Sequence, residues 1–341
     1  MGSKVSLAYP DFLIIGAQKA GTTWLHRNLQ AHPRVWMPRE KEIHYFDEKI
    51  RKRSSSFSKI FGQEPPDRRW RRQAVRRLKI YRKNLLSKNH LTWKDLQWDF
   101  KYFFGGYDDR WYATLFEPGK GRYTGEATPD YSIIDREGVA RVHEVMPEAK
   151  IVFLMRNPIE RAWSAVDMGL RFKGGSLERA SAVEIRAEFA RPKLQLFSDY
   201  RRTLENWGAF YPPERIFVGF LEDVGFFPDE MLRALYAFLE VDPSTTYRVI
   251  KRKIHSGAGS TMGTKWASHL AGVYREDLQY LDERFGGYAS FWSYCAERLA
   301  GDLSGEETIA YPLWKSYLWE EWEGAGRTCL RSGPLSSFRN V

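Results

Sequence analysis

The sequence contains only two cysteines, Cys295 and Cys329, and no long apolar run. Two cysteines cannot form a disulfide framework, and this usage is typical of a reducing compartment. The apolar runs, such as 12–16 and 151–155, are far shorter than the ~20 residues of a membrane span. The N-terminus lacks the apolar region of a secretory signal. We therefore expect a cytoplasmic protein without a transmembrane segment.

Metal-ligand patterns are also missing. The seven histidines are scattered, and the sequence contains neither His-Glu-x-x-His nor Cys-x-x-Cys. We therefore predict no metal site. The apolar content is high, by contrast: 43% of the 341 residues are hydrophobic and 15% are aromatic. Such a chain can bury a sizeable core, which excludes wholesale disorder.

The positive charge is concentrated in one segment. The whole chain carries a formal net charge of +10. Between residues 49 and 94 there are 16 lysines and arginines against two acids, a local net charge of +14, and the remainder of the chain is net −4. Any argument about an anionic partner therefore concerns residues 49–94. The segment is first explained as a solvated charged face. Binding of an acidic acceptor or an acidic membrane surface is the next interpretation, and binding of nucleic acid is the weakest.

The order of apolar runs and helical patterns predicts an α/β fold. Strands are expected at 12–15, 34–38, 150–155 and 215–221, helices at 22–31, 136–146, 159–168, 194–207 and 229–239, and one or two final helices at 266–285. This alternation indicates a central parallel sheet covered by helices on both faces. We predict one domain at 1–285, with a basic helical insertion at about 49–111. Residues 286–341 form a C-terminal extension of unassigned fold.

A glycine loop follows the first predicted strand and opens the first predicted helix. Gly16 and Gly21 have the spacing of a nucleoside-triphosphate loop, but Thr22 stands where that motif has lysine, and the lysine lies earlier at Lys19. No predicted strand ends in a clear magnesium-binding aspartate, since 151–155 is followed by Arg156. The loop therefore suits phosphate without magnesium. A plain strand–turn–helix corner that needs glycine is the competing explanation.

Two further segments carry candidate site residues. Arg156 follows a predicted strand at the edge where open α/β sheets bind ligands, and Ser164 lies two turns along the next helix. A guanidinium fork and a hydroxyl suit a second phosphate, although Arg156 taken alone is equally a structural ion-pair partner. Glu42 and His44 share a face if that segment is extended. A carboxylate and an imidazole beside a phosphate loop are candidates for general base and leaving-group stabiliser.

Together these segments resemble the sulfotransferases that use 3′-phosphoadenosine 5′-phosphosulfate (PAPS), and most closely the heparan-sulfate-type family and its bacterial relatives. Residues 16–25 resemble the 5′-phosphosulfate loop of that family, 42–47 its Glu-x-His-Phe-Phe-Asp segment, and 156–164 its 3′-phosphate segment. Residues 125–131 resemble its acceptor-side Gly-Glu-x-[Ser/Thr]-Pro-x-Tyr stretch. The resemblance implies a three-layer P-loop-like fold, PAPS as co-substrate and 3′,5′-ADP as product.

The resemblance also implies a role for each matching residue. Glu42 would be the catalytic base, Lys19 would neutralise the bridging oxygen, and His44 would assist at the sulfuryl group or the acceptor. The nucleotide would be bound by Lys19, Ala20, Gly21, Thr22, Thr23, Trp24, Arg156, Ser164, Ser256 and Gly257. The match at 255–259 is poor. Ala127 stands where some glycan-acting relatives carry lysine, so the acceptor remains open between a carbohydrate and a glycosylated or natural-product small molecule.

Two other functions compete with this one. A P-loop kinase would use the same loop to bind Mg-ATP, and a nucleic-acid-binding protein would act through residues 49–94. Contact between that basic segment and a membrane surface is a further possibility for a peripheral protein. The sequence carries no indication of oligomeric state.

Overall fold

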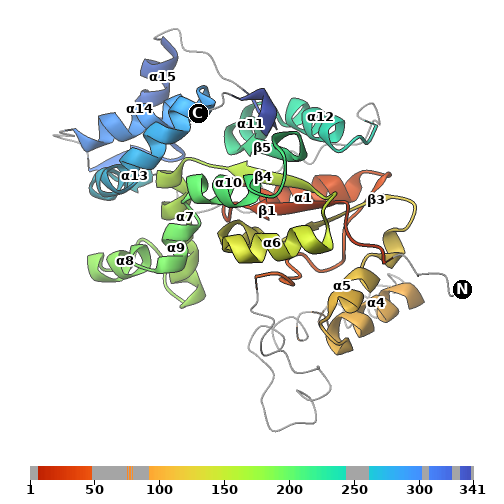
Figure 1. Cartoon of the computed structure of the whole chain (residues 1–341). Helices are drawn as coiled ribbons and strands as arrows, with labels where there is room; N and C mark the ends of the chain where they lie inside the picture. The colour runs from red at the N-terminus through yellow and green to blue at the C-terminus, as the bar shows by residue number, and fades with distance from the viewer. Residues whose placement is uncertain are drawn as a thin grey trace, which may run out of the picture.

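In the computed structural model, the described residues are 7–47, 75, 77, 79, 92–242, 261–301, 307–324 and 331–338. They form a mixed α/β molecule around a six-stranded sheet with the order β2-β3-β1-β4-β5-β8 (Figure 1). The strands of this sheet are β1 (Phe12–Gly16), β2 (Val35–Trp36), β3 (Tyr123–Ala127), β4 (Lys150–Met155), β5 (Ile216–Phe220) and β8 (Gly333–Pro334). Neighbours among the first five pair in parallel, and β8 pairs with β5 in the antiparallel direction.

The central strands are buried on both faces. Every residue of β1, β4 and β5 is buried, as expected for parallel strands covered by helices. Leu13 pairs with Glu126 of β3 on one side and with Ile151 of β4 on the other. This register brings the carboxyl ends of β1, β3 and β4 to one edge of the sheet, where the glycine loop begins. The predicted fold class, with its central parallel sheet, is confirmed.

Helices follow the strands in the order expected for this fold. The helices of the described residues are α1 (Thr22–Ala31), α4 (Trp93–Phe104), α5 (Asp109–Thr114), α6 (Arg136–Val145), α7 (Pro158–Phe172), α8 (Ala182–Phe189), α9 (Pro192–Leu196), α10 (Tyr200–Gly208), α11 (Leu221–Phe226), α12 (Pro228–Phe238), α13 (Thr264–Phe285), α14 (Tyr288–Ala300) and α15 (Tyr317–Gly324). Helices α6 and α10 lie together on one face of the sheet. On the other face α1 approaches α12, where the His32 and Tyr236 rings lie 4.6 Å apart. No described helix has both the length and the hydropathy to cross a bilayer.

One helix prediction is wrong. The expected helix at 194–207 is two helices, α9 and α10, with a break at 197–199. The break has a local cause, because the carboxylate of Asp199 caps α10 by accepting from Arg202 N–H at 2.9 Å. In addition, the Ser198 hydroxyl lies 2.6 Å from Nε of the buried Arg161 and accepts its hydrogen.

The C-terminal residues pack onto the sheet domain. The one or two helices expected at 266–285 form the single helix α13, and α14 packs along it with Trp292 fully buried. Strand β7 (Thr308–Ala310) pairs with β6 (Thr261–Gly263) in a small antiparallel ribbon. Strand β8 then extends the main sheet beyond β5. In Figure 1, α13, α14 and α15 gather at one end of the molecule. The proposed boundary between 285 and 286 stays a prediction.

The basic insertion is described only in part. Between residues 49 and 91, the structure describes positions 75, 77 and 79, which are helical. Arg77 is buried, and its guanidinium contacts the carboxylates of Glu40 at 3.0 Å and Asp99 at 3.3 Å. At least one arginine of the segment therefore serves the fold and is not available to an anionic partner.

Candidate active site

The glycine loop joins the carboxyl end of β1 to the first turn of α1. Gly21 has φ 92°, in the left-handed region that favours glycine, and immediately precedes Thr22 at the start of the helix. No side chain caps this helix. The first backbone N–H groups of α1 therefore remain available to an anion at the positive end of the helix dipole.

Lys19 lies within the loop and faces a second cation. Its backbone oxygen accepts a hydrogen bond from Nη1 of Arg156 at 3.2 Å, which joins the loop to the segment after β4. Burial lowers the pKa of the Lys19 ammonium, and the nearby guanidinium of Arg156 lowers it further. Lys19 and Arg156 thus lie close together beside the glycine loop, and Arg156 is also paired with Glu160.

Glu42 and His44 lie together, but not through the geometry expected from the sequence. The prediction that they share a face of an extended segment is wrong, since Glu42 has φ 68° and His44 has φ 60°. The backbone turns here because two bonds fix it: Glu42 N–H donates to Ala127 O at 3.0 Å, and Tyr45 N–H donates to the Tyr131 hydroxyl at 3.0 Å. The turn leaves His44 Nε2 at 3.7 Å from Glu42 Oε2.

Lys41 connects this carboxylate with the loop. Its ammonium lies 2.9 Å from Glu42 Oε1 and 3.4 Å from the Thr22 hydroxyl oxygen. Burial alone raises the pKa of Glu42, but the nearby imidazole of His44 and the charge of Lys41 outweigh burial, so this pKa lies well below its usual range. Glu42 is therefore a carboxylate at neutral pH, and 41% of its side chain is exposed. Sequence reasoning missed Lys41.

His44 is oriented from its other nitrogen. Its Nδ1 lies 2.5 Å from Asp47 Oδ2, so the remaining nitrogen, Nε2, faces Glu42. A carboxylate on one ring nitrogen fixes the tautomer and the ring orientation, as in many catalytic histidines.

The segment 125–131 lies behind this turn and supports it. The carboxylate of Glu126 is fully buried and accepts from the hydroxyls of Thr128 (2.6 Å), Tyr131 (2.8 Å) and Tyr112. Burial raises the pKa of Glu126, while those hydroxyl hydrogen bonds act in the opposite direction. Because Tyr131 also accepts from Tyr45 N–H, the network fixes the backbone that carries Glu42 and His44. The supporting role of Tyr131 was not visible in the sequence.

Arg156 is buried in a dense set of contacts. Its Nε and Nη2 donate to Glu160 Oε2 at 3.1 and 2.9 Å, and Nη2 also lies 2.5 Å from the Tyr311 hydroxyl. With the bond to Lys19 O, four of its five N–H groups are engaged. Arg156 thus forms a structural ion pair with Glu160, which the sequence analysis gave as an alternative role for this residue. The phosphate role remains a prediction.

The other predicted nucleotide residues fall into three groups. Ala20, Thr22 and Ser164 are buried beside the loop, and Thr23 is half-buried at the start of α1. The indole of Trp24 is also buried. Ser256 and Gly257 lie outside the described residues.

One group of potential metal ligands lies beside the turn. Ligand atoms of His44, Asp47 and Asp130 are within 4.8 Å of one another. Each of these three side chains already has a partner, because His44 is bonded to Asp47 and the Lys193 ammonium contacts Asp130. The donor set therefore describes a compensated polar cluster.

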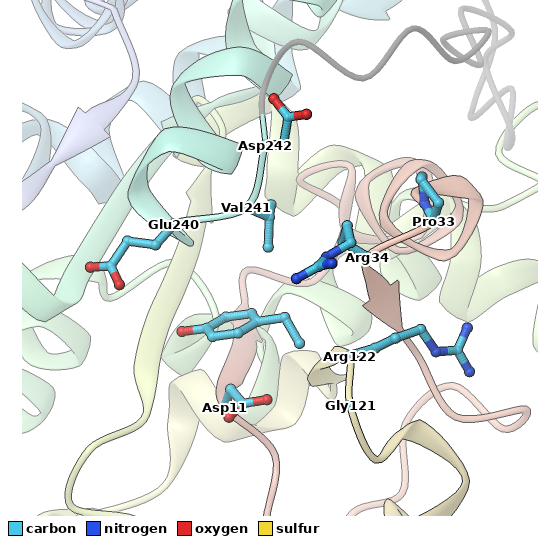
Figure 2. A pocket seen from close by; sticks show the side chains of 9 residues that line it. Asp11, Pro33, Arg34, Gly121, Arg122, Glu240, Val241 and Asp242 are labelled. Carbon is cyan, nitrogen blue, oxygen red and sulfur yellow. The ribbon is translucent and has the colours of Figure 1, made fainter.

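A separate hollow lies at the opposite edge of the sheet, where the parallel strands begin (Figure 2). Arg34 points into it and Arg122 points away. The carboxylate of Asp11 is held by the backbone and hydroxyl of Thr124, and Glu240 pairs with Lys150. The acidic side chains thus serve local structure, and the loop lies at the other end of the strands. The residues that line this hollow are Asp11, Pro33, Arg34, Gly121, Arg122, Tyr123, Glu240, Val241 and Asp242.

Fold and site together define an α/β protein of the P-loop-like class, with a glycine loop at the carboxyl edge of its sheet. More narrowly, the chain belongs to the sulfotransferase family, whose family model matches residues 10–245. It is 25% identical over 170 residues to the membrane-associated sulfotransferase kil1 of Dictyostelium discoideum. That match covers 49% of this chain and 24% of the longer relative. The crystal structure of a sulfotransferase from Alicyclobacillus acidocaldarius has the same fold, with a TM-score of 0.52 at 21% identity, over 81% of this chain and 95% of that one.

Proposed function

We propose that the protein transfers the sulfuryl group of PAPS to a hydroxyl or amine of an acceptor, as an enzyme of the EC 2.8.2 type. One observation carries the proposal. The ionised carboxylate of Glu42 lies next to the anion-binding loop. The ammonium of Lys41 connects the two, because it lies 2.9 Å from the Glu42 carboxylate and 3.4 Å from the hydroxyl oxygen of Thr22 in the loop. A base and an anion loop in this proximity suit transfer of an anionic group to a nucleophile.

In the proposed reaction, the acceptor oxygen or nitrogen attacks sulfur in line with the bridging oxygen. One S–O bond breaks while the new bond to sulfur forms, and Glu42 takes the acceptor proton. The donor leaves as 3′,5′-ADP, with the bridging oxygen carrying the electron pair of the broken bond. Lys19 and the N–H groups of α1 stabilise that oxygen, and no redox step or metal ion is required. Arg156 and Ser164 bind the 3′-phosphate.

A P-loop kinase is the closest alternative. Thr22 occupies the position of the kinase lysine, and membership of the sulfotransferase family also argues against this alternative. Thermal stabilisation separates the two functions, because a ligand that binds the folded state raises the melting temperature. We expect stabilisation by 3′,5′-ADP without magnesium. Stabilisation by Mg-ATP alone would instead support a kinase.

Replacement of Glu42 tests the proposed base. Glu42→Gln keeps the size and polarity of the side chain but removes the proton acceptor, so kcat should fall ~10²–10⁴-fold. The Kd for 3′,5′-ADP should change little, since Glu42 does not bind the nucleotide. Glu205→Gln, at an exposed ion pair with Arg201, is the matched control and should behave as wild type. An equal loss of donor affinity in Glu42→Gln would contradict the assignment.

For the acceptor we propose a carbohydrate or a glycosylated or natural-product small molecule. The groups beside His44 support this choice. Asp130 and the half-exposed Lys193 offer an acceptor and a donor of hydrogen bonds next to the turn, as recognition of a hydroxyl-rich molecule requires. A labelled-donor screen across sugars, phenols, amines and peptides tests it, and labelling confined to peptides would refute it.

We also propose peripheral contact with an anionic membrane surface. Trp93, Leu96, Phe100 and Phe104 lie on one face of α4 at helical spacing, and Trp93 and Phe100 are 72% and 66% exposed. Lys94 and Lys101 flank this stripe, and the neighbouring segment 49–94 is strongly basic. Aromatic side chains beside cations are typical of helices that lie in the interface of a bilayer. The relative kil1 is described as membrane-associated. A cytoplasmic location stays a prediction.

Vesicle sedimentation measures this contact. Wild type should sediment with vesicles of phosphatidylserine and phosphatidylcholine and less with phosphatidylcholine alone. Phe100→Ser together with Trp93→Ser should reduce sedimentation several-fold without changing the melting temperature, because both rings are exposed. Val273→Ser, at an exposed position on α13, is the control. Unchanged sedimentation of the double variant would refute a role for α4.

A further inference from the structure

A tyrosine from the C-terminal residues lies on the proposed 3′-phosphate residues. Tyr311 follows β7 and is 5% exposed. Nη2 of Arg156 lies 2.5 Å from its hydroxyl oxygen, and the nearby Ser164 side chain lowers the pKa of the same hydroxyl. The Arg156 guanidinium carbon is also 5.2 Å from the centre of the ring. Tyr311 thus contacts Arg156 and lies near Ser164, the two proposed ligands of the 3′-phosphate.

The backbone on either side of Tyr311 is fixed. On one side, β7 pairs with β6. On the other, Leu313 N–H donates to Glu160 Oε1 at 2.6 Å, while Oε2 of the same carboxylate holds Arg156. Glu160 is fully buried, so one carboxylate joins the arginine to the C-terminal chain. The position of Tyr311 is therefore as well determined as that of Arg156.

The geometry defines what this hydroxyl can do. A phosphate oxygen that reaches both Arg156 and Ser164 also comes close to the Tyr311 hydroxyl, which is bonded to Arg156 and lies near Ser164. A phenol accepts from a guanidinium and donates its own hydrogen at the same time. Burial raises the pKa of Tyr311, so its hydroxyl keeps that hydrogen at neutral pH.

We propose that Tyr311 is a third side chain of the 3′-phosphate subsite and that it contributes to selection of 3′-phosphorylated nucleotides. The inference rests on the proposed function and extends it, since it makes the C-terminal residues part of the donor site. Arg156 supplies the charge, and Ser164 and Tyr311 supply directed hydroxyls. A nucleotide without the 3′-phosphate makes no phosphate contact with any of the three side chains.

Calorimetric titration with two nucleotides tests this role. We use 3′,5′-ADP and 5′-AMP, which differ only in the 3′-phosphate. Tyr311→Phe keeps the ring over Arg156 and removes only the hydroxyl. Its affinity for 3′,5′-ADP should fall about 10-fold, in line with loss of a hydrogen bond to a charged group, while its affinity for 5′-AMP should not change. Tyr211→Phe is the control, since this buried tyrosine donates to Met146 O away from the site.

A double variant adds a readout that a purely structural tyrosine would not move. If Tyr311 and Ser164 bind one phosphate, the loss in Tyr311→Phe/Ser164→Ala should differ from the sum of the single losses for 3′,5′-ADP and equal it for 5′-AMP. Equal losses on both nucleotides, no loss, or tighter binding of 3′,5′-ADP by Tyr311→Phe would overturn the inference. If wild type itself does not prefer 3′,5′-ADP, the proposed function fails. If wild type prefers 3′,5′-ADP and Tyr311→Phe keeps the full preference, only the role of Tyr311 fails.

Discussion

Single residues at this site derive their properties from their neighbours. Glu42 remains ionised because His44 and Lys41 outweigh the effect of burial on its pKa. Lys19 shows the opposite result, since burial and Arg156 both lower the pKa of its ammonium. A carboxylate that stays charged and a lysine that loses its proton more easily than usual predict different pH behaviour for catalysis and binding.

Nucleotide binding should depend on pH through Lys19. As the pH rises through the lowered pKa of Lys19, below its ordinary 10.5, the free protein loses this charge and the Kd for 3′,5′-ADP increases. The bound nucleotide raises the same pKa, so binding takes up protons in this range. Lys19→Met should bind about 10-fold more weakly at neutral pH and lose the alkaline dependence. Calorimetry at several alkaline pH values measures both effects.

The exposed Lys120 provides the control for that measurement. Lys120→Met removes one positive charge on the surface and should keep the wild-type pH profile. A Kd for 3′,5′-ADP that is flat with pH in wild type would show that Lys19 does not face the bound anion.

At the scale of elements, short segments far apart in sequence fix one another. The 3-10 helix η3 (Pro129–Ile133) carries Tyr131, which holds the turn at 42–47 through Tyr45 N–H. The ring of Tyr45 stacks on Tyr112 at 4.5 Å, so the turn is supported from two sides. The orientation of the proposed base thus depends on a hydroxyl carried by an element more than 80 residues away in sequence.

Tyr131→Phe tests this support. The variant leaves the buried Tyr45 N–H without its acceptor, so the free energy of unfolding should fall by about 1–3 kcal/mol. We expect kcat to fall while the Kd for 3′,5′-ADP stays constant, because the glycine loop is untouched. Tyr211→Phe should show a similar loss of stability with an unchanged kcat. A parallel loss of kcat in both variants would mean that stability alone explains the effect.

The elements that the sequence predicted well are those determined locally. Strand β4 is a continuous apolar run, and Asn157 and Pro158 mark the start of α7, where the Asn157 side chain accepts from Ile159 N–H. The contact between Arg156 and Tyr311 joins residues 155 positions apart, and no periodicity indicates it. The turn at 42–47 likewise depends on a distant hydroxyl. The sequence therefore predicts the residue types of the site, but not the contacts that orient them.

At the scale of the whole molecule, the C-terminal residues belong to the fold. Trp292 of α14 is fully buried and donates through Nε1 to Glu222 of α11 at 2.6 Å. Burial raises the pKa of Glu222 to about 8, so the protonated form persists into the neutral range. Asp223 accepts from the backbone and side chain of Ser332 at 2.7 and 2.6 Å. Removal of the C-terminal residues would leave both acidic side chains without these partners.

Truncation after Phe285 should therefore abolish cooperative folding. The shortened chain would lose α14, β7 and β8 and leave the apolar face of α13 bare. Circular dichroism melting of residues 1–285 against the full chain measures this outcome. A cooperative transition with unchanged affinity for 3′,5′-ADP would show instead that residues 1–285 form an autonomous unit and that Tyr311 is dispensable.

The two outer strands of the sheet are also the shortest. Strand β2 lies outside β3 and β8 lies outside β5, and each has two residues. Pro334 in β8 has no N–H group to offer. Within the main sheet of the described residues, a neighbouring molecule that added a strand would therefore find only a two-residue edge strand on either side, which disfavours edge-to-edge pairing there.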